Sequence, residues 1–231
     1  MRYLKTIFGM LAVVIGLSGC GKPFEVEELP EEQLAELTMG RHTIDLMVGD
    51  TFQVPTKVTP DSLAGRGIYW ESADTTIVRI SEGKVVALAP GETSVKAIAM
   101  AGEKSDTCHV RVLPLWVIDP YVFRYDMVVY ADVKVNNQNA HDNMVVGVFG
   151  QDEDGLSQLK GLGNLRRSAD GLTYMQLRIY SNNDNGEPLS VKCYDRSQAL
   201  LMESNDRLTF ENNSTLGTLS SLYSIAFEEK K

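Results

Sequence analysis

Short apolar runs separated by turn residues recur along most of this chain and constrain its fold more than any other feature. From 38 to 113, runs rich in Val, Ile and Thr are broken about every ten residues by turn sequences such as Gly49-Asp50 and Ala89-Pro90-Gly91. No stretch of the folded part shows a sustained helical period of apolar residues. The pattern therefore predicts an all-β fold.

The apolar residues of the longer runs alternate with polar ones. In 105–113, Cys108, Val110 and Val112 fall on one side, and in 125–135 the apolar side includes Met127 and Val129. Successive side chains of a strand point to opposite faces, so one face is expected to pack on a core and the other to meet solvent. With a junction between Pro114 and Pro120, we predict two β-sandwich domains in tandem, at 38–113 and 115–231.

Five motifs in the first of these domains resemble a known family. They are Val48-Gly49-Asp50-Thr51, Val58-Thr59-Pro60, Trp70-Glu71-Ser72-Ala73-Asp74, Gly83-Lys84-Val85-Val86-Ala87-Leu88 and Pro90-Gly91-Glu92-Thr93. Together they resemble the bacterial group 2 immunoglobulin-like domain. The resemblance implies an immunoglobulin-like sandwich with Trp70 in its core, used as a spacer or display module in surface proteins and adhesins, with no active site.

The second domain is similar to C-terminal β-sandwich modules of Bacteroidetes surface proteins. The similarity is carried by a strand at 125–135 followed by the acidic segment 148–155, and by Leu208-Thr209-Phe210 leading into Leu216-Gly217. This resemblance implies the fold only, because no catalytic role is defined for such modules.

The first twenty residues have the pattern of an export sequence. Arg2 and Lys5 precede the apolar run 6–17, which at 1.5 Å per residue spans about 18 Å and is too short for a ~30 Å hydrocarbon core. Leu17-Ser18-Gly19-Cys20 follows and resembles the lipobox of bacterial lipoproteins. The resemblance implies that 1–19 is a signal peptide and that Cys20 carries lipid (palmitate among its acyl chains) and anchors the protein to a membrane. The alternative is an ordinary secretory signal with a chance cysteine.

The segment after Cys20 is acidic. Six glutamates and one lysine lie between positions 21 and 37, and like charges repel one another and anionic headgroups. We predict that 20–37 is an extended tether, although one or two helical turns beginning at Pro30 are an alternative. Acidic residues in this place also resemble the surface-export signal of Bacteroidetes lipoproteins, which implies an outer-membrane protein exposed on the cell surface.

Composition and spacing exclude several classes of function. The chain has 22 basic and 31 acidic residues among 231, a net charge of −9, which argues against nucleic-acid binding. The three histidines and three cysteines form no metal-ligand spacing, and no nucleophile–His–acid order or phosphate-binding glycine loop occurs. We therefore expect no catalytic residue, no cofactor and no metal, and hence no enzyme.

Two polar loops could in principle offer oxygens to Ca²⁺. They are Asp152-Glu153-Asp154 and Asn182-Asn183-Asp184-Asn185, but neither has EF-hand spacing, so solvated hairpin tips are the preferred interpretation. Cys108 and Cys193 are predicted to be buried free thiols, with a disulfide between the two domains as the alternative.

A row of aromatic side chains is the candidate ligand-binding surface. Tyr130, Tyr174, Tyr180 and Tyr194 all fall on the polar side of their strands, together with Arg178. Tyrosine rings offer apolar area with a polar tip, which suits a glycan or protein ligand. The alternatives are the ordinary preference of strands for aromatic residues, and burial under a loop or the neighbouring domain.

These features predict a lipid-anchored cell-envelope protein that acts by contact. Surface adhesion or display is the leading function, with the first domain as spacer and the second as the binding end. A glycan-binding accessory lipoprotein of a polysaccharide-uptake system and a subunit of an envelope assembly remain as alternatives.

Overall fold

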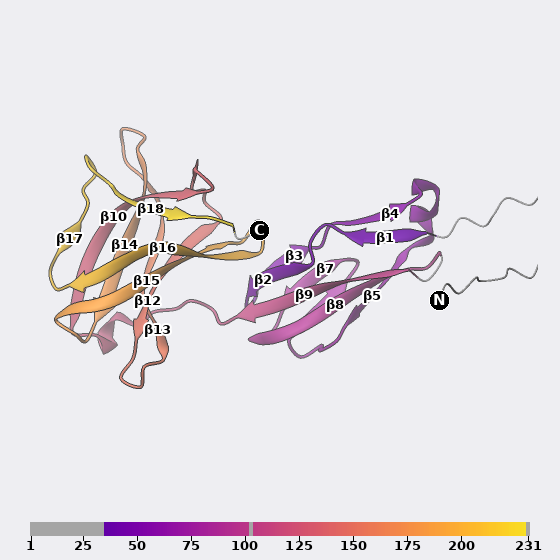
Figure 1. The fold of residues 1–231 in the computed structure, drawn as a ribbon, viewed down its shortest axis with the longest axis horizontal. Helices are drawn as coiled ribbons and strands as arrows, with labels where there is room; N and C mark the ends of the chain where they lie inside the picture. The colour runs from indigo at the N-terminus through magenta and orange to yellow at the C-terminus, as the bar shows by residue number, and fades with distance from the viewer. Residues whose placement is uncertain (1–34, 102–103, 230–231) are drawn as a thin grey trace, which may run out of the picture. The chain divides into compact units, whose positions relative to one another are not determined.

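The computed structural model describes residues 35–101 and 104–229 (Figure 1). The predicted signal peptide, Cys20 and the tether as far as position 34 lie outside the described residues. Leu34–Lys231 groups into one compact unit. Within the described ranges, no helix has the length and apolar character needed to cross a bilayer.

Almost all regular structure is β, which confirms the predicted all-β class. The strands of the first half are β1 (Glu36–Met39), β2 (Thr43–Met47), β3 (Thr51–Gln53), β4 (Thr56–Thr59), β5 (Ile68–Ser72), β6 (Val78–Ser81), β7 (Lys84–Ala87), β8 (Gly91–Ala99) and β9 (Ser105–Leu113). Those of the second half are β10 (Tyr125–Val135), β11 (Gln138–Asn139), β12 (Met144–Gln151), β13 (Ser157–Arg167), β14 (Thr173–Ser181), β15 (Asn185–Asp195), β16 (Leu200–Glu211), β17 (Thr215–Leu216) and β18 (Tyr223–Phe227). Two short 3-10 helices, η1 (Asp61–Arg66) and η2 (Pro120–Val122), interrupt them.

The first half encloses one hydrophobic core between small sheets. The strand orders are β2-β9-β8-β5, β3-β7-β6 and β1-β4, with β2 parallel to β9. Cys108, Val110 and Val112 of β9 are buried in this core, as the alternation in the sequence predicted. Trp70 is only half-buried and packs against this core, so it is not the fully buried core tryptophan that the resemblance implied.

The folded part begins earlier than the sequence indicated. Ala35, Leu37 and Met39 are buried in the first core, and β1 pairs with β4 in antiparallel register. Residues 36 and 37 therefore belong to a strand, which corrects both the tether and the helical-turn interpretation for this end of 20–37. Burying the apolar side chains at alternate positions lowers the free energy of the folded state, because each is removed from water. This gain favours a strand here despite the neighbouring glutamates.

The second half is one nine-stranded sheet instead of two separate sheets. Its order is β11-β10-β14-β13-β12-β15-β16, and β17 and β18 both pair with β10 in parallel. β18 also meets the far edge strand β16, since Ser204 Oγ donates to the Ala226 carbonyl and the Ala226 N–H donates to Asp206. The sheet thus curls around a single core (Figure 1).

The interior of this curled sheet follows the predicted alternation. Met127, Val129 and Ala131 of β10 are buried, and so are Met175, Leu177 and Ile179 of β14 and Val191 and Cys193 of β15. Gly161 and Gly163 lie within β13, where the chain passes close to β14. A methyl group on Gly161 would come within 2.7 Å of the Arg178 carbonyl oxygen and 3.0 Å of Ile179 Cα.

The two cysteines in the described residues are free and buried, as predicted, and no disulfide joins the domains through them. Burial raises the pKa of the Cys108 thiol to about 11 and that of the Cys193 thiol to about 12. Both thiols therefore stay protonated at neutral pH.

We predict that Gly161→Ala lowers the free energy of unfolding by roughly 1–3 kcal/mol, because the added methyl group meets backbone atoms that cannot turn away. Gly65→Ala is the matched control, since no atom lies within 4 Å of the added carbon there, and it should stay within about 0.5 kcal/mol of wild type. Urea denaturation measures both, and equal stability of the two variants would contradict the close packing of β13 on β14.

We also predict that Cys108 and Cys193 resist alkylation in the folded protein at pH 8 and react once it is unfolded. Both folded pKa values are raised above the ordinary thiol value, so their contribution to stability is complete below about pH 8.5 and declines as the pH rises towards 11 and 12. Mass-spectrometric peptide mapping after iodoacetamide treatment separates these sites from Cys20. Rapid labelling of either residue in the native protein would refute their burial.

Candidate functional site

Two of the predicted tyrosines form a pair on the outer face of the second domain. Tyr130 on β10 and Tyr174 on β14 are half-buried, and their ring centroids lie 5.9 Å apart at an interplanar angle of 46°. Strands β10 and β14 are neighbours, which brings the two rings together. This pair keeps the partly exposed aromatic area that the sequence predicted.

Arg178 and Tyr180 lie further along the same strand and are already engaged by other groups. Arg178 Nε donates to Asp126 Oδ2 at 3.0 Å, and this hydrogen bond raises the pKa of the guanidinium. The guanidinium carbon also lies 5.8 Å from the Tyr180 ring centroid. The other partner of Tyr180 is Phe123, whose ring stacks at 5.9 Å and 21°.

Tyr194 does not belong to the exposed surface, and its prediction as a ligand-binding residue is wrong. Its side chain is 0% exposed. The hydroxyl donates to Asp50 Oδ2 at 2.9 Å and accepts from the Met47 N–H at 3.2 Å, so it joins the second half of the chain to the turn between β2 and β3. Burial, followed by the hydrogen bond to Asp50, raises the pKa of this hydroxyl. The alternative of burial against the neighbouring domain holds for this residue.

The segment that joins the two halves covers more of the outer face of the second domain's sheet than the sequence indicated. The Trp116 ring lies 5.3 Å from Phe149 and 6.4 Å from Tyr194, edge-on to both. Gly147 on β12 makes room for it, because a methyl group there would lie 2.9 Å from the indole. Trp116 and Phe123 both pack on the sheet, and the aromatic residues within and just after the segment bounded by Pro114 and Pro120 were the signal that could have indicated this.

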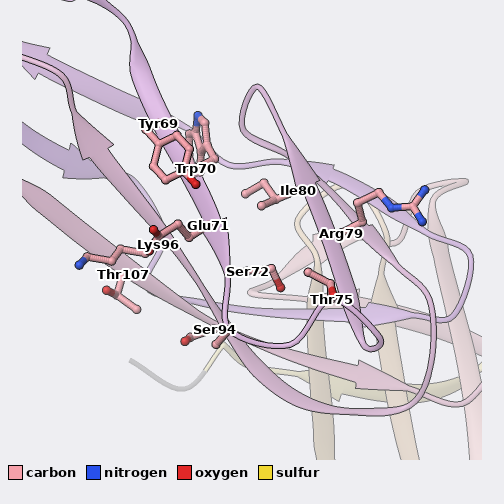
Figure 2. Close-up of a pocket in the computed structure, with 11 residues that line it drawn as sticks. Tyr69, Trp70, Glu71, Ser72, Thr75, Arg79, Ile80, Ser94, Lys96 and Thr107 are labelled. Atoms are coloured by element: carbon pink, nitrogen blue, oxygen red, sulfur yellow. The ribbon is translucent and has the colours of Figure 1, made fainter.

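A cavity of about 520 Å³ lies on the first domain, between β5 and β6 (Figure 2). Its lining includes Tyr69 and Trp70 from β5, Arg79 and Ile80 from β6, and Lys96 from β8. In Figure 2 the Arg79 side chain points away from the two aromatic rings. Glu71 of β5 also lines the cavity and lies opposite Lys96 of β8 in the strand register, so one acidic and one basic side chain flank the two aromatic rings (Figure 2).

A second cavity, of about 620 Å³, brings together two loops that the sequence treated separately. Asp152, Glu153 and Asp154 of the β12–β13 hairpin and Asn182 and Asn183 of the β14–β15 turn all line it. Nevertheless, no group of three or more His, Cys, Asp or Glu side chains suited to a metal ion occurs in the described part of the chain. The wall is completed by Gln151, Gln158, Val122, Arg124 and the buried Lys160.

Comparison with known proteins identifies the first of the two domains. Residues 37–110 match the bacterial Ig-like domain (group 2). The predicted resemblance is thereby confirmed for this domain.

Two uncharacterised proteins of Clostridium acetobutylicum are similar to part of the chain. One is 29% identical over 84 residues and the other 30% identical over 81 residues. These segments cover 36% and 34% of this chain, but only 21% and 8% of the respective relatives. The chain therefore spans about a fifth of one curated relative and less than a tenth of the other.

Solved structures with some likeness include domains 4–9 of the surface layer protein SbsC and bovine butyrophilin. The first has a TM-score of 0.30 and 14% identity over 80% of this chain and 32% of that chain. The second has a TM-score of 0.28 and 12% identity over 77% and 98% of the two chains. Scores of this size carry no functional conclusion.

We predict that Tyr194→Phe lowers the free energy of unfolding by about 1–3 kcal/mol, because the Met47 N–H and the Asp50 carboxylate each lose a buried partner. Tyr174→Phe is the matched control, because no hydrogen bond of its hydroxyl is present in the described residues, and it should be nearly neutral. Thermal denaturation of the two variants provides the measurement. A Tyr194→Phe protein as stable as wild type would show that this hydroxyl contributes nothing to the joint.

Proposed function

We propose that this protein is a lipid-anchored component of the bacterial cell envelope that acts by contact, in surface adhesion or display. The observation that carries the proposal is the group 2 Ig-like domain at 37–110, which follows a lipobox-like sequence ending at Cys20. Domains of this family serve as spacer or display modules in surface proteins. A spacer next to a membrane anchor would hold the second domain at a distance from the membrane.

Anchoring and reach would be divided between different parts of the chain. Each buried methylene contributes about 0.8 kcal/mol to membrane binding, so more than one acyl chain on Cys20 is needed for stable attachment. The acidic tether after Cys20 would be repelled by anionic headgroups. The folded domains then need no apolar membrane patch of their own, which agrees with their acidic composition.

Recognition is assigned to the second domain. Its outer face carries the Tyr130–Tyr174 pair, and the loops at one end surround the polar cavity lined by Lys160. No catalytic arrangement of side chains is needed for this function, because binding alone accounts for it.

A subunit of an envelope assembly is the second candidate, favoured by the exposed apolar side chains of the junction. Leu115, Val117, Tyr121 and Val122 are exposed, with Tyr121 at 95%. Four large apolar residues within eight positions would be covered if a partner protein packed on this segment.

We predict that cells supplied with labelled palmitate incorporate the label into this protein. Cys20→Ser should abolish the label and release the protein from the membrane fraction, because the Cys20 thiol is the attachment point for the lipid. Cys108→Ser is the matched control and should retain the label.

Protease treatment of intact cells tests the surface location separately. Digestion of the anchored protein on intact cells would support adhesion or display. Complete protection on intact cells, with digestion after lysis, would contradict that function and favour an internal envelope assembly.

A further inference from the structure

The core of the second domain contains a charged cluster at one end. Lys160 and Glu187 have side chains only 4% and 5% exposed, and Lys160 Nζ lies 3.4 Å from Glu187 Oε1. Ser181 Oγ, also buried, donates to the other carboxylate oxygen. Glu187 Oε1 has no hydrogen-bond partner in the described residues, so the ion pair is held by charge attraction without a formed hydrogen bond.

A β-bulge aims Lys160 into this position. The register between β12 and β13 passes from Val148↔Gly161 to Phe149↔Leu159, which leaves Lys160 as the extra residue. Both Lys160 and Gly161 are buried although they are neighbours in a strand. Bulges are over-represented at sheet edges, at barrel rims and next to active sites, where they re-aim a side chain.

Stability alone does not account for a buried pair of this kind. Removing each ion from water costs several kcal/mol, and replacing a buried pair by apolar side chains of similar volume is often neutral or stabilising. The ammonium has three donors, yet no hydrogen bond from Lys160 is present within 35–101 and 104–229. Its other neighbour is the Phe123 ring, with the centroid 5.3 Å away.

Lys160 lines the polar cavity of about 620 Å³ at this end of the sheet. Three segments distant in sequence form the wall, and hydrogen bonds fix them in place. The Arg124 N–H donates to Asn182 Oδ1 at 3.1 Å, and Asp152 Oδ1 accepts from the Asp154 and Leu156 N–H groups at 3.0 and 2.8 Å. The site is therefore formed before a ligand arrives.

The chemistry of the wall defines the class of ligand. Two cationic side chains, Arg124 and Lys160, face three carboxylates at 152–154, and four amide side chains lie among them: Gln151, Gln158, Asn182 and Asn183. A simple anion would meet the carboxylates, and a simple cation would meet the ammonium and guanidinium. Hydroxyl groups donate and accept hydrogen bonds, so a ligand rich in hydroxyls satisfies both kinds of partner.

We propose that this cavity, with the Lys160 ammonium in its wall, binds a neutral saccharide. The volume is within the range of sites for small ligands. The proposal rests on the proposed function only in assigning recognition to the second domain.

The test measures binding of disaccharides to the purified full chain by calorimetry and saturation-transfer NMR. The probes are maltose, cellobiose, lactose and diacetylchitobiose, with inorganic phosphate and the dipeptide Ala-Ala as charged alternatives. Neither lipid nor cells are involved, so a failure of binding is distinct from a failure of anchoring or surface exposure.

Two variants remove the site and one preserves it. Lys160→Met alone would leave Glu187 charged and unpaired, so the double change Lys160→Met with Glu187→Leu is used, and its thermal melting shows whether it folds. Arg124→Gln removes the second cation from an exposed position without touching the core. Arg167→Gln is the matched control, because Arg167 is exposed, pairs with Asp142 at 3.4 Å and does not line the cavity.

We expect at least one disaccharide to bind, and both site variants to weaken that binding at least about tenfold, because each removes a charged donor. Arg167→Gln should change the affinity by less than about twofold. Absence of disaccharide binding would overturn the proposal. So would a loss of binding in Arg167→Gln as large as in the site variants, or a preference for phosphate or Ala-Ala.

Discussion

Successive side chains of a strand point to opposite faces, and this constraint shapes most of the molecule. In both halves the apolar residues of each long strand are gathered on one face, where they leave water and form a single core. The backbone groups between them are paired by neighbouring strands. In the second half the pairing continues from β16 across the sheet to β18 and returns to β16 through Ser204 and Asp206, so the curled sheet leaves few open edges.

The alternation of buried and exposed side chains is interrupted in β13, and a buried ion pair lies at that point. The bulge at Lys160 places a cation inside the sheet, opposite Glu187, at the end where three loops surround a polar cavity. The other buried polar side chains of the second half include Asp195 and Ser204. The proposed saccharide site lies at this end of the second domain, away from the Tyr130–Tyr174 pair that the sequence pointed to.

The junction between the halves has a structural role. Trp116 packs on Phe149 and Tyr194, and Phe123 stacks on Tyr180, so the segment covers aromatic area that a free sheet face would expose. Tyr194 links this area to Met47 and Asp50. What remains exposed of the aromatic surface is the Tyr130–Tyr174 pair and the apolar residues of the junction itself.

The sequence by itself determined the all-β class, the Ig-like first domain and the buried faces of β9, β10 and β14, because alternation and turn residues are local properties of the chain. The fate of Tyr194 and of Lys160 was decided only by tertiary structure. Tyr194 obeys the alternation, but another part of the chain covers its face, and Lys160 is turned inward by a bulge that appears only when β12 and β13 pair. Likewise the loops at 152–154 and 182–183 are separate hairpin tips in the sequence and share one cavity in the fold, because the β12–β13 hairpin lies between β14 and β15 in the sheet.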